Sequence, residues 1–401
     1  MDRKYISTER ADLFDVNMMI LMSIDVIGCA EASQIMQAFY HAVNAHEILG
    51  TKIVIDKNGN AYYEPCNRKN NTIRFCAQST GEILNEQEKI RFRIEEGEFL
   101  RAFVRKNQKG FAITFLLNHL AGDGKSLCYF IESFMMSLAG QELKYIPMKH
   151  ITVDDLPAKS RLPFIFRLFA KCYNDKWKKE KKIFGFADMD NSFHQFWEKH
   201  KTVVKTRVIG ENELISMKNI CHDKHIGLTS FLIADYIKNA IGVQEIGLAV
   251  DGRLDRNRCM GNQATGIAVK YKYRRNKDML FNAKKIDHAM KRKLTNVQYK
   301  YFILHLMAAF DGTLIDAVNL EHSKSFTSAV SKKLATVLGY GKKTKDFSIS
   351  NLTTIDIPTR YGEFYIDNVT FVPPVISYGK NVIGIITSNN KMIISRHNYG
   401  E

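Results

Sequence analysis

The sequence lacks the features that define several classes of protein. Its seven cysteines are scattered, odd in number and include no C-x-x-C pair, so neither a disulfide framework nor a four-thiolate zinc site is expected. No low-complexity tract, heptad array or internal repeat is present. The N-terminus holds no apolar signal segment, and the most apolar early stretch, residues 16–27, is too short to span a bilayer. We therefore expect a cytoplasmic protein with reduced thiols and no metal site.

Acidic residues are scarce relative to basic ones. The chain has 42 Asp and Glu against 58 Lys and Arg, which gives a net charge of +16. Basic residues gather in segments 171–182, 270–293 and 332–345. Such runs are typical of solvated helix faces, and they equally suit attraction of a phosphorylated or acidic partner. The charge does not require nucleic acid, and we expect none as a partner.

The first basic segment directly follows an apolar one. The apolar side chains are those of Leu162, Phe164, Ile165, Phe166, Leu168 and Phe169. Aromatic and basic residues together are typical of a peripheral membrane contact. The same pattern suits a helix that covers a protein core. Both interpretations stay open at this point.

The length and composition predict a globular protein with more than one core. A chain of 401 residues is too long for a single ordinary core, and its 45% hydrophobic and 25% charged residues are normal for a folded protein. Residues 145–200 look irregular and carry Pro147, Pro157 and Pro163. We expect an N-terminal lobe over residues 1–165, a crossover linker over 166–200 and a C-terminal lobe over 201–401.

Both halves mix strands with helices. In the first half, hydrophobic periodicity predicts helices at 31–48 and 126–138 and strands at 16–26, 52–56, 61–63, 73–77, 99–105 and 110–119. In the second half it predicts helices at 211–222, 229–241 and within 279–340, and strands at 202–209, 245–251, 347–352, 367–372, 381–387 and 391–395. The absence of strict β-α-β alternation favours a mixed, two-layer α/β fold.

The most informative segment is Asn-His-Leu-Ala-Gly-Asp-Gly at residues 118–124. The alternation of Phe111, Ile113, Phe115 and Leu117 continues to His119, which places the imidazole at the end of a buried strand. Imidazole has an unperturbed pKa of about 6.5, so it takes and returns a proton near neutral pH. This setting suits a general base that activates a hydroxyl or an amine.

Structural interpretations of the same residues are open. A single histidine at a strand end is often simply packed or hydrogen-bonded. Asp123 is also a favoured N-cap for a helix that begins at Gly124. A nucleophilic role for Cys128 is disfavoured, because that residue lies on the inner stripe of a predicted helix.

The spacing of His119, Asp123 and Gly124 resembles the H-x-x-x-D-G signature of the chloramphenicol-acetyltransferase-like superfamily. This superfamily includes plant-type alcohol acyltransferases, wax ester synthases and the condensation domains of nonribosomal peptide synthetases. The resemblance covers nearly the full chain through softer matches. These are Phe14-Asp15-Val16, the helix end 45–49, the apolar helix 229–240, Val250-Asp251-Gly252-Arg253 with Gly261-Asn262, and the strand 348–352.

The resemblance implies two chloramphenicol-acetyltransferase-like lobes that form a pseudo-dimer with a tunnel between them. His119 would be the base, and Asp123 would pair with Arg253 in a structural salt bridge. Gly124 would leave room for a pantetheine arm. Ser350 and Asn351 are the candidates for polar groups near the oxyanion, and strand-end residues of no catalytic role are an equal interpretation.

The resemblance leaves the subfamily open. Condensation domains usually carry two consecutive histidines, and here the first position is Asn118. The D-F-G-W-G element of plant acyltransferases is absent, apart from a loosely similar Asp346-Phe347.

Three functional hypotheses follow. The first is an acyltransferase that uses acyl-CoA and an alcohol or amine acceptor, with Lys342 and Lys343 near the CoA phosphates. The second is a free-standing condensation enzyme that takes its acyl group from an acidic carrier protein. The third is a catalytically silent scaffold of the same fold. In the first two the thioester, on CoA or phosphopantetheine, is a cosubstrate and no cofactor is bound permanently. A monomer is expected, because one chain supplies both lobes.

Overall fold

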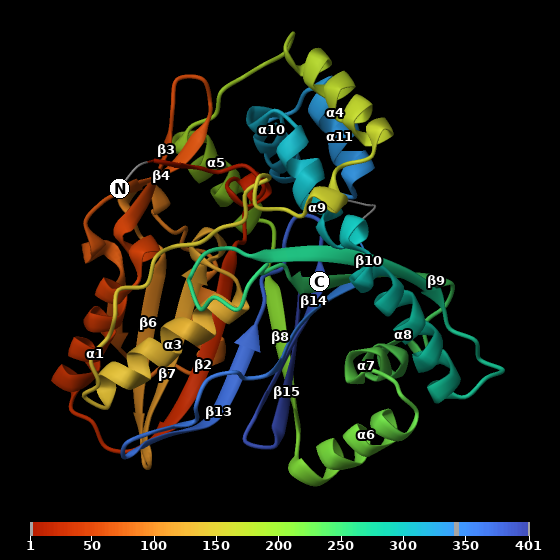
Figure 1. Ribbon diagram of the computed structural model, residues 1–401. Helices are drawn as coiled ribbons and strands as arrows, with labels where there is room; N and C mark the ends of the chain where they lie inside the picture. The colour runs from red at the N-terminus through yellow and green to blue at the C-terminus, as the bar shows by residue number, and fades with distance from the viewer. Residues whose placement is uncertain (1–2, 341–344, 400–401) are drawn as a thin grey trace.

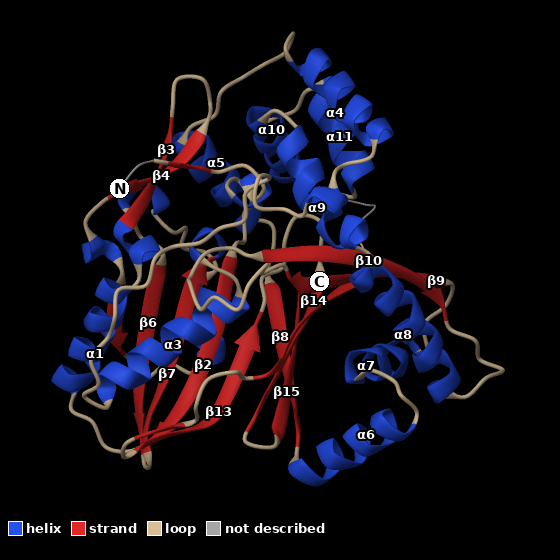
Figure 2. Ribbon diagram, in the orientation of Figure 1, coloured by secondary structure: helices blue, strands red, loops and turns tan. Residues whose placement is uncertain are grey.

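The chain builds two six-stranded sheets that lie side by side (Figure 1, Figure 2). The computed structural model describes residues 3–340 and 345–399. The strands are β1 (Lys4–Tyr5), β2 (Met19–Ile27), β3 (Thr51–Ile55), β4 (Ala61–Pro65), β5 (Thr72–Phe75), β6 (Leu100–Asn107), β7 (Gly110–Asn118), β8 (Thr202–Ile209), β9 (Val243–Asp251), β10 (Ala264–Lys272), β11 (Phe347–Thr354), β12 (Arg360–Tyr361), β13 (Phe364–Val372), β14 (Asn381–Ser388) and β15 (Lys391–Tyr399). The α-helices are α1 (Ala32–Ala45), α2 (Thr80–Gln87), α3 (Gly124–Leu138), α4 (Phe164–Trp177), α5 (Phe186–Trp197), α6 (Glu211–Asp223), α7 (Leu228–Ile237), α8 (Met279–Thr295), α9 (Val297–Ala309), α10 (Gly312–Ser323) and α11 (Ala329–Leu338).

The first sheet has the strand order β12-β13-β2-β7-β6-β5 and is covered by α1 and α3. The inner stripe of α3 packs its aromatic rings onto the ring of Phe115 on β7, with centroids 5.6 Å away for Phe130 and 5.5 Å away for Phe134. Edge-to-face contacts of this kind add to the stabilisation from apolar burial. The packing fixes β7 in the middle of the sheet and α3 directly after it, which is where the His119 segment lies.

The second sheet has the order β10-β9-β11-β14-β15-β8 and forms its own core. Helices α6, α7 and α8 contribute Leu214, Ile233 and Ile286 to that core, which also holds Ile246 and Phe347 from the sheet. Strand β11 runs parallel to both β9 and β14. Leu352 near its end approaches Gly124 at the start of α3. Mixed sheets covered by helices in both halves confirm the predicted two-layer α/β class.

The predicted boundary of the C-terminal lobe needs a correction. Residues 201–401 were all assigned to the second lobe, but β12 and β13 belong to the first sheet, where Val369 pairs with Ile24 of β2. Strand β13 buries Ile366, Val369 and Phe371 in the first core. The two halves of the chain are therefore linked by an exchanged strand.

The predicted linker at residues 166–200 also needs a correction. It is largely helical, since α4 begins at Phe164 and α5 follows. Helix α4 packs on α9 and α11, whereas α5 packs on α10 (Figure 1). Trp177 at the end of α4 is fully buried, and its indole N–H donates to the hydroxyl of Thr313 at 2.8 Å. The segment is part of a helical layer rather than an open connection.

Among the described residues, no single helix is long and apolar enough to cross a membrane. Helices α9 and α10 meet the length and composition criteria only when taken together, across a bend of 99°. All seven cysteine thiols are unpaired.

Candidate active site

His119 is held at the point where β7 ends. Its backbone N–H donates to the carbonyl of Met18 at 2.8 Å, and the backbone N–H of Asn118 donates to the carbonyl of Phe99 at 2.9 Å. The Asn118 side chain accepts a hydrogen bond from the N–H of Leu120 at 3.0 Å and so caps a short 3-10 turn, His119–Ala121. Neighbouring segments of the first sheet thus fix the backbone on both sides, so the imidazole stands on a rigid support.

A buried carboxylate that no sequence pattern indicates lies beside the imidazole of His119. Asp12 Oδ2 is 3.8 Å from Nδ1 of His119, and it accepts a hydrogen bond from the side chain of Asn262 at 2.7 Å. Nδ1 is buried and has no hydrogen-bond partner. The 3.8 Å separation is too long for a hydrogen bond, but catalytic contacts often tighten only when substrate binds.

The position of Asp12 has a chemical consequence. Burial raises the pKa of the Asp12 carboxyl above its ordinary value, although the His119 imidazole and the Asn262 amide oppose the effect. A carboxylate on the Nδ1 side favours the tautomer with a proton on Nδ1, which leaves Nε2 free to accept a proton. Asp12 is therefore suited to orient the imidazole of His119.

With His119 as the general base that is proposed below, we predict that Asp12→Asn lowers kcat by about 10–100-fold while KM changes little, because the tautomer of the imidazole is no longer fixed. Steady-state kinetics on the folded variant measure both values. Asp12→Glu keeps the charge and should recover part of kcat. A variant with unchanged kcat, or an effect confined to KM, would rule out the positioning role.

Asp123 is saturated with hydrogen bonds and is not free for proton transfer. It caps α3 by accepting the N–H of Ser126 at 2.8 Å, and it receives both terminal nitrogens of Arg253 at 2.9 and 3.0 Å. The backbone N–H of Gln263 adds a further contact at 3.2 Å. Both charged side chains are almost fully buried. Burial lowers the pKa of the Arg253 guanidinium, but Asp123 outweighs this effect and raises that pKa above its ordinary value. The structure therefore brings Asp123 and Arg253 together as a bridge between the two halves of the chain.

Gly124 allows the end of β11 to approach the start of α3. A Cβ atom at this position would lie 2.9 Å from a methyl carbon of Leu352 and 3.2 Å from the ring of Phe371. Contacts shorter than about 3.0–3.4 Å require the neighbour to move. The space next to Gly124 is filled by Leu352, so any pantetheine arm that passes here must displace that flexible side chain.

The candidates for the oxyanion site are on β11, and their printed hydrogen bonds go to residues other than His119. The amide of Asn351 donates to the hydroxyl of Thr229 at 2.8 Å and accepts the N–H of Thr353 at 2.7 Å. Ser350 sits in the parallel ladder between β9 and β14. Within the described ranges neither residue is hydrogen-bonded to His119. Lys342 and Lys343, the candidates for CoA binding, lie outside the described residues.

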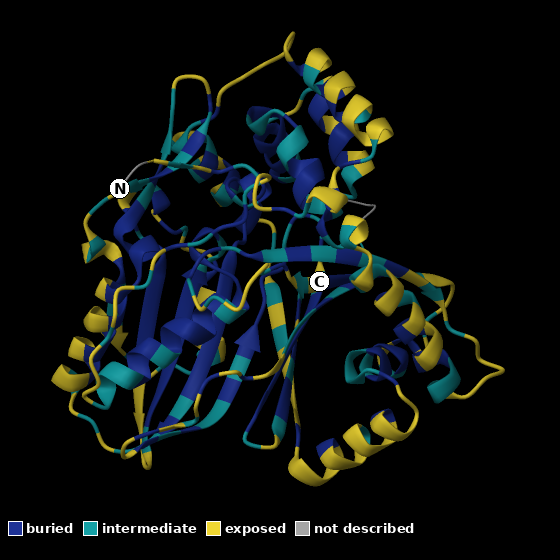
Figure 3. Cartoon of the chain, viewed as in Figure 1, coloured by how far each residue is buried: buried dark blue, intermediate teal, exposed yellow. Residues whose placement is uncertain are grey.

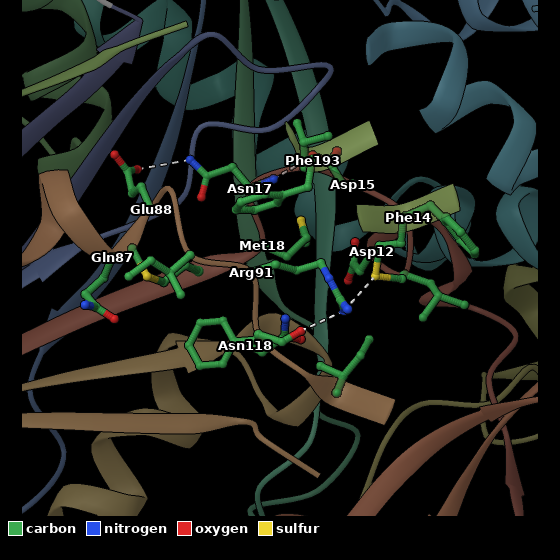
Figure 4. A pocket seen from close by; sticks show the side chains of 17 residues that line it. Asp12, Phe14, Asp15, Asn17, Met18, Gln87, Glu88, Arg91, Asn118 and Phe193 are labelled. Atoms are coloured by element: carbon green, nitrogen blue, oxygen red, sulfur yellow. Dashed lines mark hydrogen bonds between the residues drawn. The ribbon is translucent and has the colours of Figure 1, made fainter. Parts of the chain in front are cut away.

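A cavity lies beside the His119 segment (Figure 4). Asp12, Asp15, Glu88, Arg91 and Asn118 are among its lining residues. Most of these polar groups already have partners. Asp15 accepts the backbone N–H of Ser377 at 3.1 Å, Glu88 accepts the Asn17 amide at 3.1 Å, and Arg91 pairs with Asp190 at 2.6 Å. Asp12 is the lining carboxylate that also lies next to the imidazole of His119.

Cys128 is unsuited to nucleophilic chemistry. Its side chain is buried on α3, and burial raises the pKa of the thiol far above its ordinary value, so the thiolate is not formed near neutral pH. For the acyl-transfer activity that is proposed below, measured as thiol release, we predict that Cys128→Ala behaves like the unaltered protein. An inactive variant that is folded by circular dichroism would contradict this prediction.

Comparisons with known proteins agree at the level of the fold. No family model matches the sequence, and no curated protein matches it. Among solved structures, the trichothecene 15-O-acetyltransferase TRI3 from Fusarium sporotrichioides superimposes with a TM-score of 0.65 at 11% identity, over 99% of this chain and 90% of that one. The first condensation domain of the CDA synthetase gives 0.64 at 10% identity, over 99% and 90%. The epimerization domain from the third module of tyrocidine synthetase B gives 0.62 at 14% identity, over 99% and 91%. The chain has the fold of condensation domains and chloramphenicol-acetyltransferase-like acyltransferases.

The similarity confirms the fold that the motif suggested. It extends over almost the whole chain, so both lobes are included. At 10–14% identity it concerns architecture alone, and the chemistry has to be argued from the residues of this chain.

Proposed function

We propose that the protein is an acyltransferase that moves an acyl group from a thioester to a hydroxyl or amine acceptor, with His119 as the general base. The observation that carries the proposal is the rigidly held imidazole of His119 beside the buried carboxylate of Asp12. Further support comes from proteins of the same fold, which include a trichothecene 15-O-acetyltransferase and a condensation domain solved with a substrate analogue.

The reaction would need no covalent acyl-enzyme. The acceptor hydroxyl or amine gives its proton to Nε2 of His119 as its oxygen or nitrogen attacks the thioester carbonyl. The tetrahedral oxyanion then collapses, the carbon–sulfur bond breaks, and the imidazolium returns the proton to the leaving thiolate. Hydrogen-bond donors near the oxyanion would lower the barrier, and Ser350 and Asn351 stay our candidates for that role. The two substrates would reach His119 from opposite faces, through the tunnel between the lobes that the family resemblance implies.

The donor would be acyl-CoA, with phosphates that meet the basic surface and Lys342 and Lys343. We predict that raising the ionic strength increases KM for acyl-CoA severalfold, because salt screens attraction between exposed charges. Initial rates over a range of salt concentrations measure this dependence. The matched control is a donor without phosphates, such as an N-acetylcysteamine thioester, for which KM should stay flat. If KM for acyl-CoA also stays constant as the salt concentration rises, exposed charges do not attract the donor.

A condensation enzyme with an acidic carrier protein is the second candidate, since a net charge of +16 suits such a donor equally well. The test supplies the same acyl group on CoA and on a carrier-protein pantetheine and measures thiol release with each. Turnover with CoA alone supports the first proposal, and turnover only with the carrier supports the second. Silence with both would favour a scaffold of this fold. We further propose that the protein acts in the cytoplasm as a monomer, with no nucleic acid partner and no resident cofactor or metal.

A further inference from the structure

The outer face of α4 carries apolar side chains that the fold does not use. Helix α4 packs on α9 and α11 through its inner face, where Ala170, Tyr173 and Trp177 are buried. On the opposite side, Phe164 is 66% exposed, Ile165 69% and Leu168 48%. The helix lies at the edge of the molecule, with its exposed face directed away from both sheets (Figure 1, Figure 3). The buried inner face holds the helix in place, so the exposed residues do not contribute to the packing of the protein core.

Cations surround these apolar residues. Between residues 159 and 182 the chain has nine Lys and Arg against two acids, Asp175 and Glu180. Arg167 and Lys171 lie exposed on α4 next to the apolar group. A shallow groove on the same face is lined by Leu168, Lys171, Cys172, Asp175, Lys176 and Lys179. The carboxylate of Asp175 pairs with the ammonium of Lys178 at 2.8 Å. The remaining cations leave this face with a net positive charge.

We propose that the outer face of α4 binds the surface of an anionic lipid membrane. Phe164 and Ile165 are in the first turn of the helix and would enter the boundary between headgroups and acyl chains. Arg167, Lys171 and Lys176 follow along the helix, and Lys179 lies just beyond its end. These four cations would meet the lipid phosphates. This order, with apolar anchors next to a polybasic stretch, supplies the two kinds of attraction that hold interfacial helices on membranes. The proposal is independent of the acyl-transfer proposal.

An acidic protein is the competing partner, and the exposed side chains favour the membrane over it. Cations alone would be enough to attract an acidic surface. Two large apolar side chains, each about two-thirds exposed at one helix end, are instead costly in water and gain free energy by entering lipid. The lipid surface accounts for both the cations and the apolar anchors.

The test is flotation of the full-length protein with phosphatidylcholine vesicles that contain or lack phosphatidylserine. We expect binding to the anionic vesicles and at least about tenfold weaker binding to neutral ones. The double variant Phe164→Ser with Ile165→Ser should bind anionic vesicles at least about tenfold more weakly, since about 1.4 kcal/mol of lost apolar insertion has that effect. In the double variant Arg167→Glu with Lys171→Glu, affinity for the anionic vesicles should fall at least about fivefold for each cation replaced.

Matched controls come from the second lobe. Ile241 is 87% exposed and Val243 58%, so Ile241→Ser with Val243→Ser removes comparable apolar surface elsewhere. Lys284→Glu with Lys285→Glu reverses two exposed charges on α8. Both controls should bind like the unaltered protein. All altered side chains are exposed, so thermal unfolding should be unchanged. The proposal is overturned if anionic vesicles are not bound, if the controls lose binding as much as the α4 variants, or if the α4 cations matter only for an added acidic carrier protein.

Discussion

Replacing His119 with alanine is expected to lower acceptor-dependent thiol release by about 10²–10⁴-fold, the usual contribution of a positioned general base. The reason is that the described residues bring no second base beside the imidazole, since Asp123 is held by Arg253 and Asp12 faces Nδ1. Initial rates at saturating donor and acceptor measure the loss. KM values should change less than kcat, because the imidazole acts on the proton that moves in the transition state.

A matched control separates loss of the base from general damage. His305 is also largely buried, bonded to the hydroxyl of Ser160 at 2.9 Å, and lies on α9. His305→Ala makes the same substitution at a histidine on another element and should retain activity. If folded His119→Ala keeps the rate of the unaltered protein, His119 is not the base.

Breaking the pair between Asp123 and Arg253 is expected to destabilise the protein by about 3–5 kcal/mol, the cost of leaving one buried charge without its partner. Arg253→Met removes the guanidinium but keeps an apolar stem of similar length. Asp123 would then retain only its bonds to Ser126 and Gln263. Denaturant unfolding of the variant and the unaltered protein under identical conditions measures the difference.

Two further variants test whether burial is the reason. Arg207 and Glu213 form an exposed pair at 2.6 Å, and Arg207→Met should cost only about 0–1 kcal/mol. The double variant Asp123→Asn with Arg253→Met removes both charges and should recover part of the loss. Equal effects of Arg253→Met and Arg207→Met would show that the buried bridge does not stabilise the fold.

The position of His119 could be predicted because its signals are local. Strand β7 alternates large apolar side chains up to Leu117, and α3 carries an inner stripe with Phe130 and Phe134. Each pattern spans fewer than 20 residues, as the element bounds show. Asp123 and Arg253 are 130 residues apart in the sequence. Their pairing was expected from the family resemblance and not from any local pattern.

Other features depend on contacts that no local pattern encodes. Strand β13 was expected from its periodicity, but nothing in it tells which sheet it joins, and it pairs with β2 some 343 residues away. Strand β10 was missed, since Gly266 and its two lysines, Lys270 and Lys272, weaken its apolar pattern. Helix α4 was taken for a linker because Pro163 and its basic residues resemble a connection. Asp12 was missed because its approach to His119 comes from the tertiary fold.

Acceptor-dependent thiol release tests the central claim most directly. The measurement offers acyl-CoAs from short to long, and the same acyl groups on a carrier protein, with a mixture of alcohols and amines, to the unaltered protein and to His119→Ala. The account predicts release that requires an acceptor and is lost in the folded variant. Release that is equal in both proteins, or silence of the unaltered protein with every donor, would contradict it.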